Sequence, residues 1–139
     1  MEPTIEQALQ QGVVVHNGGD LNEAERIYRA ILKSYPNHPD ANHNLGLIVV
    51  SVNQADAALP LFKNALDANP TIEQFWVSYI DALVRANQMK EAKRVAKKGK
   101  KKGINAKKLD RIISQSKDIT DTKSPSPDQL VSLMEHYQN

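Results

Sequence analysis

Apolar residues recur along this chain at helical rather than strand spacing. Between residues 21 and 32 they follow the i, i+3, i+4, i+7 pattern of an amphipathic helix, at Leu21, Ala24, Ile27, Tyr28, Ile31 and Leu32. Comparable stretches cover residues 4–17, 42–51, 54–68, 72–86 and 89–101, and short turns such as Gly18-Gly19-Asp20 separate them. Thr4 and Gln7 predict a capping box at the first helix. The pattern predicts an all-α chain of antiparallel helix pairs.

The helix pairs repeat every 34 residues, as Gly12 and Gly46 first show. The same spacing relates Ala24 to Ala58, Tyr28 to Phe62 and Pro36 to Pro70. We expect the two glycines to face the two alanines, so that paired helices approach closely. The two aromatic residues are expected to reach into the next unit, and the prolines to end each unit. Because no pair can bury both of its faces alone, neighbouring units should stack into a right-handed solenoid.

These repeats divide the chain into a solenoid, residues 1–115, and a tail. The predicted hairpins cover about residues 4–36, 38–70 and 71–104, and a helix over 106–115 covers the end of the third. Residues 116–127 are expected to form a polar linker. Residues 128–139 then predict a terminal helix with Leu130, Leu133, Met134 and Tyr137 on one stripe. We interpret it as the first helix of a truncated further repeat, in a longer protein; the alternative is a helix folding back onto the third unit.

The repeat resembles the tetratricopeptide repeat (TPR) family over about residues 4–104. The second unit carries most of the resemblance, with Leu45, Gly46, Val49, Ala58, Phe62, Ala65 and Pro70. It departs at Asn42, where an aromatic residue is usual. In the third unit Ile80 replaces the glycine, so we expect a wider or tilted hairpin there. The resemblance implies a TPR-like right-handed α-solenoid whose first helices line a concave groove.

Composition narrows the classes of protein that fit. The chain has no cysteine, which excludes disulfides and thiolate metal sites and is compatible with a reducing compartment. It lacks the apolar run of a membrane span and the features of a signal peptide, so we expect a cytoplasmic protein without membrane association. The net charge of +2 is uneven: residues 1–89 carry 5 basic and 10 acidic side chains, and residues 90–111 carry 11 and 2.

One short stretch, PNHPDANHNLG, gathers His38, Asp40 and His43. These histidines are five residues apart across a turn, so they do not share a helical face as metal-binding pairs do. We interpret His38 as lying near a helix N-cap, with Pro39 in the first turn, and His43 as a surface residue. No catalytic motif occurs in the sequence. We therefore expect no enzymatic activity, no cofactor and no metal.

The TPR resemblance implies a groove position for Asn44, with Gln10 and Ser78 as its equivalents 34 residues away. The run NHNLG is also similar to repeats of O-linked N-acetylglucosamine transferase, where asparagines form a ladder along the groove. Neighbouring groove candidates are His16, Asn17, His43, Ser51, Asp81 and Arg85. The alternative is a solvated helix face without a ligand. Lysines that grip a peptide carboxylate in chaperone-binding TPRs are missing here, so that mode is not expected.

A basic surface forms a second candidate site, on the helix that begins at Met89. Its members share one side of that helix: Lys90, Lys93, Arg94, Lys97 and Lys101. Such a surface attracts phosphates or acidic proteins. No aromatic residue interleaves it, which disfavours nucleic acid. A solvated outer face is the simplest interpretation, followed by an acidic partner or the acidic surface of another copy.

Together these patterns predict a non-catalytic protein–protein interaction module that binds a peptide or protein segment in its groove. The runs EAERIYRAIL, HPDANHNLG and ALPLFKNAL resemble bacterial repeats fused to glycosyltransferase, sulfotransferase or methyltransferase domains. That resemblance implies recruitment of a protein substrate to a catalytic domain outside this sequence. The alternatives are a self-associating scaffold and a basic nucleic-acid-binding module.

Overall fold

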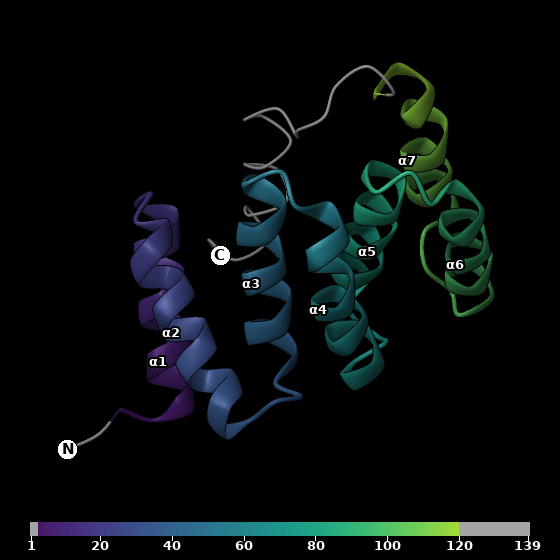
Figure 1. The fold of residues 1–139 in the computed structure, drawn as a ribbon. Helices are drawn as coiled ribbons and strands as arrows, with labels where there is room; N and C mark the ends of the chain where they lie inside the picture. The colour runs from purple at the N-terminus through teal and green to yellow at the C-terminus, as the bar shows by residue number, and fades with distance from the viewer. Residues whose placement is uncertain (1–2, 120–139) are drawn as a thin grey trace.

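The protein is an all-helical solenoid in which successive helix pairs lie side by side (Figure 1). The computed structural model describes residues 3–119, with side chains to residue 115. Within that range the helices are α1 (Ile5–Asn17), α2 (Leu21–Ser34), α3 (Pro39–Ser51), α4 (Ala55–Ala68), α5 (Glu73–Arg85), α6 (Met89–Lys101) and α7 (Ala106–Ile119). The predicted fold class is confirmed. The predicted terminal helix over 128–139 and most of the predicted linker lie outside the described residues.

The helices begin and turn where local chemistry favours it. Thr4 and Gln7 form the predicted capping box, with bonds of 2.9 and 3.1 Å between each side chain and the other residue's backbone N–H. His38 is the N-cap of α3, where its Nδ1 accepts from the Ala41 N–H at 3.1 Å. Asn53 and Asn87 take positive φ angles of 63° and 61° in the turns after α3 and α5, a conformation that asparagine tolerates better than most residues.

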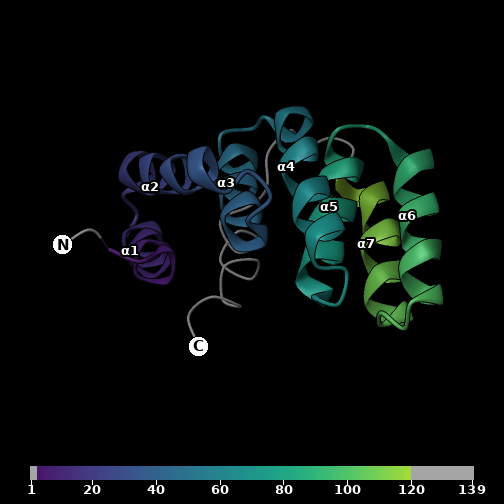
Figure 2. The same ribbon diagram turned by 90° about the horizontal axis from the view of Figure 1, so that it is seen from below.

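The first helices of the units, α1, α3 and α5, form the inner layer. Helix α3 contacts both α1 and α5, whereas α2, α4 and α6 make no comparable contacts with one another. Figure 2 shows α2 and α4 along one side of the row and α6 at its far end, beyond α7. As the central element, α3 is buried at every position from Ala41 to Val50.

A glycine against an aromatic ring sets the spacing within the first two pairs. A Cβ added at Gly46 would lie 2.5–2.9 Å from three atoms of the Phe62 ring, and one at Gly12 would lie 2.6 Å from Tyr28 Cε1. The nearest neighbours of these glycines are therefore the two aromatic rings, which the sequence analysis did not place there. The rings of α2 and α4 contact the glycine of their own unit, because only a missing Cβ leaves room for a ring between two close helices. Tyr28 also belongs to an apolar cluster with Leu45 and Ile48 of the next unit.

The third pair contains the same contact with its partners exchanged. Ile80 stands where the first two units have glycine, but Gly99 lies on α6, and a Cβ there would be 3.1 Å from Trp76 Cε3 on α5. The Trp76 indole N–H donates to the Pro70 carbonyl at 2.8 Å. Helices α5 and α6 contact each other less extensively than α3 and α4 do, and α7 packs against both. The core of the second and third units is continuous through these contacts.

We predict that Gly46→Ala destabilises the protein by about 1–3 kcal/mol, because the new methyl group displaces the Phe62 ring from a packed core. This loss exceeds the gain in helix propensity from alanine. Urea unfolding measures the change. Gly18→Ala is the matched control, since Gly18 has a φ of −77° and its Cβ would meet only ordinary contacts at 3.4 Å or more. Equal stability of Gly46→Ala and the wild type would contradict the proposed packing constraint.

Candidate functional site

The predicted groove residues divide into an accessible set and a buried set. Gln10 and Asn17 are exposed, and Ser51, Asp81 and Arg85 are half-buried. Four others are inside the protein, namely His16, His43, Asn44 and Ser78, which are at most 6% exposed. The interpretation of His43 as a surface residue was therefore wrong. The inner face is not an open row of polar side chains, because α3 is enclosed around its whole circumference.

Asn44 lies beside a polar contact that joins α1 and α2. His16 Nδ1 and the Tyr28 hydroxyl are 3.1 Å apart, within hydrogen-bond distance. Burial raises the pKa of Tyr28 well above its usual range, and a weak hydrogen-bonding contact with the Asn44 side chain opposes part of that rise. Within the described part of the chain, neither polar atom of the Asn44 amide has a partner with good hydrogen-bond geometry. A buried amide without well-formed hydrogen bonds lowers the free energy of unfolding by about 1–3 kcal/mol.

His43 connects the second unit to the third. Its Nε2 lies 2.7 Å from the Ser78 hydroxyl on α5, and Gln74 Nε2 approaches the same hydroxyl at 3.4 Å. The imidazole ring also packs against two aromatic rings, with centroids 5.5 Å from Phe62 and 4.9 Å from Phe75. His43 and Ser78 thus form a buried polar contact between neighbouring units.

Asp81 and Arg85 pair along α5. Arg85 Nε donates to Asp81 Oδ2 at 2.8 Å, and the side chains are 5% and 17% exposed. Burial raises the pKa of Asp81, while the Arg85 charge and hydrogen bond act in the opposite direction. The half-buried pair places fixed charge at the third unit's end of the inner face.

The histidines do not assemble a metal site in the described residues. His38 caps α3, and His43 is packed against Ser78 and two aromatic rings. No three His, Asp or Glu side chains in residues 3–115 gather as metal ligands do. None of the helices described is long and apolar enough to cross a membrane.

The predicted basic residues lie on α6. Lys90, Lys93, Arg94, Lys97 and Lys101 are all exposed. The structure adds Lys98 and Lys102, which the sequence analysis left out and which line a cavity with Arg94. The signal that would have found them is their spacing of four and eight residues from Arg94, because residues four apart lie on the same helical face.

We predict that His16 makes stability pH-dependent. Burial lowers its pKa from 6.5 to about 4, so the folded ring stays neutral where the unfolded ring is already protonated. Between these two pH values the unfolded state binds more protons, and stability falls as the pH falls from about 6.5 to 4. The loss is about 3 kcal/mol at most. Urea unfolding across this range should show a shallower pH dependence for His16→Gln; an unchanged slope would refute the assignment.

A family model and solved structures match the chain. Residues 49–103 match the model of a tetratricopeptide repeat family, a segment that begins within α3 and ends just after α6. No curated protein matched the chain.

Solved structures extend the likeness over nearly the whole chain. A point mutant of MamA is 21% identical, with a TM-score of 0.69, and the match covers 98% of this chain and 75% of that one. A second structure, MamA MSR-1 C2, is 20% identical, with a TM-score of 0.70, covering 99% and 80%. At these identities the likeness concerns the fold. Residues 49–103 thus match a tetratricopeptide repeat model, and the chain folds as a TPR-like solenoid.

Proposed function

We propose that the protein is a non-enzymatic interaction module that binds an extended segment of another protein along the inner face of α1, α3 and α5. Tetratricopeptide repeats and the solenoid fold support a role in protein–protein interaction. The observation that carries the proposal is the Asn44 amide, which lies on the central inner helix and whose one polar contact among the described residues is a weak one with the Tyr28 side chain.

The chemistry of an extended peptide suits this amide. Each peptide unit presents one N–H and one C=O, and an asparagine side chain presents a carbonyl acceptor and two N–H donors. A bound backbone can therefore satisfy both ends of Asn44 at once. The amide is 1% exposed, so binding has to open the inner face locally. The hydrogen bonds gained then offset the cost of an amide that has only a weak polar contact in the free protein.

Half-buried and exposed polar residues continue the same face on either side. Gln10 and Asn17 are exposed on α1, and the Asp81–Arg85 pair lies on α5. The central contact to Asn44 is independent of ligand sequence, because it uses the peptide backbone. Side-chain preference then comes from the flanking units.

We predict that Asn44→Leu separates binding from stability. Leucine of similar size removes the unsatisfied amide, so the free energy of unfolding should stay the same or rise. Affinity for peptides selected from a random phage-displayed library should fall by about 1 kcal/mol or more, roughly fivefold. Fluorescence anisotropy with the labelled selected peptides measures this loss.

The matched control is Asn64→Leu, because Asn64 is exposed on α4 in the outer layer. It should leave the affinity unchanged. Equal affinities of the wild type and Asn44→Leu, with the fold intact by circular dichroism, would place the ligand elsewhere. Failure to select any peptide whose binding depends on inner-face residues would refute the proposed function.

A further inference from the structure

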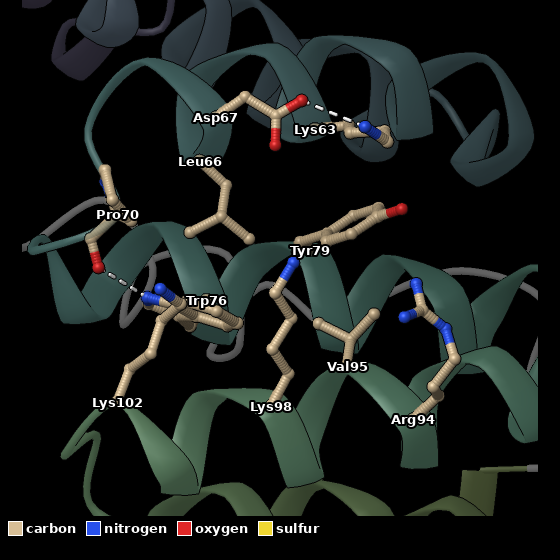
Figure 3. A pocket seen from close by; sticks show the side chains of 10 residues that line it. All are labelled: Lys63, Leu66, Asp67, Pro70, Trp76, Tyr79, Arg94, Val95, Lys98 and Lys102. Atoms are coloured by element: carbon tan, nitrogen blue, oxygen red, sulfur yellow. Dashed lines mark hydrogen bonds and ion pairs between the residues drawn. The ribbon is translucent and has the colours of Figure 1, made fainter.

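The outer side of the protein contains a cavity of about 230 Å³ between α4 and α6. The first helices α1, α3 and α5 contact one another, but α4 and α6 make no comparable contact. This leaves space between α4 and α6 for the cavity. Figure 3 shows the α5 side chains Trp76 and Tyr79 between residues of α4 and residues of α6. Neither of the two sites predicted from the sequence, the groove and the basic surface on α6, contains all the residues that line this cavity.

The cavity is strongly cationic. Lys63, Arg94, Lys98 and Lys102 line it, and Asp67 is the one carboxylate in the lining, which gives a net charge of +3 from four positive charges and one negative. Lys63 pairs with Asp67 at 2.9 Å, and Arg94 pairs with Glu91. Lys98 and Lys102 have no ion-pair partner among the described side chains. They are four residues apart, about 6 Å along α6, so their ammonium groups can bind two neighbouring anionic groups.

The floor of the cavity is apolar and rigid. Leu66, Trp76, Tyr79 and Val95 line it and are each at most 8% exposed. The Trp76 indole is held by its bond to the Pro70 carbonyl, and the ring packs beside Gly99. Because both aromatic residues are so deeply buried, their faces are not available for the base stacking that single-stranded nucleic acid uses. A small aliphatic side chain can still contact the floor.

We propose that this cavity, defined by Lys98, Lys102 and the floor at Tyr79 and Val95, binds an acidic segment of a partner protein in which carboxylates flank an aliphatic side chain. The carboxylates pair with Lys98 and Lys102, and the aliphatic group fills the apolar floor. Charge complementarity favours this occupant, because neither lysine pairs with a carboxylate among the side chains that the structure describes. The site lies on the outer side, so it is separate from the proposed inner-face function and does not depend on Asn44.

The test uses the full 139-residue chain and a fluorescein-labelled peptide of glutamate and leucine, in which glutamates flank each leucine. Anisotropy should show saturable binding that weakens as salt rises. Replacing the glutamates with glutamine, or the leucines with serine, should each weaken binding about tenfold. Equal binding of the three peptides would overturn the proposal, and so would no binding of the first.

Two double variants with the same change in charge locate the site. Lys98→Gln with Lys102→Gln should weaken binding of the glutamate–leucine peptide about tenfold. Lys93→Gln with Lys97→Gln is the matched control, because these residues are also exposed, four apart and on α6, but do not line the cavity. The control should change the affinity less than about twofold, since it alters only screened long-range charge. Equal losses would show that the peptide binds the general charge of the helix, and would overturn the assignment.

Two further measurements distinguish other occupants. Tighter binding of a single-stranded oligonucleotide than of the peptide, lost in the Lys98/Lys102 variant, would make the surface a nucleic-acid site and overturn the proposal. Concentration-dependent self-association in sedimentation, abolished by the same variant, would make a second copy the occupant instead. Asn44→Leu should bind the glutamate–leucine peptide with the same affinity as the wild type. A failure of the cavity proposal can therefore be distinguished from a failure of the proposed inner-face function.

Discussion

The structure depends on one steric constraint: in each helix pair an aromatic ring packs against a glycine. At Gly46 the Phe62 ring occupies the volume that a Cβ would take, and Tyr28 does the same at Gly12. This contact fixes the distance between two helices more tightly than general apolar packing, because a single methyl group abolishes it. The repeat therefore retains its geometry although most other positions differ between units. In the third pair the ring is on the first helix, at Trp76, and the glycine is on the second, at Gly99.

This exchange has consequences for the surface. In the first two units the ring lies on the second helix and turns inward, which brings Phe62 against His43. In the third unit Trp76 starts from the inner helix and lies between α4 and α6, where its indole is fixed by the Pro70 carbonyl. Trp76 becomes part of the cavity lining, and Leu109 of α7 packs beside it at Gly99. One exchanged contact thus closes the end of the solenoid and provides the floor of the cationic cavity.

Much of the fold could be predicted from the sequence, because the relevant signals are local. The Thr4 capping box, the His38 cap and the helices themselves follow from residue type and spacing. The inner-face residues could not be predicted in the same way. Repeat spacing assigns Asn44 to the inner side of its helix, but whether that side meets solvent depends on neighbouring helices far away in the sequence. Likewise, the charge pattern of α6 alone grouped Lys97 with Arg94. The cavity is lined by Lys98 and Lys102 together with residues of α4 and α5, which that pattern does not include.

Buried polar contacts fix the inner helices relative to their neighbours. His16 with Tyr28, and His43 with Ser78, place hydrogen-bonding pairs at defined positions within and between units. Sliding one helix past its neighbour would leave such groups unpaired at a cost of about 1–3 kcal/mol each, so these pairs help to fix the stacking register. Asn44 follows His43 on α3 and makes only a weak contact with the Tyr28 side chain, so it contributes less to this register than the two histidine contacts do.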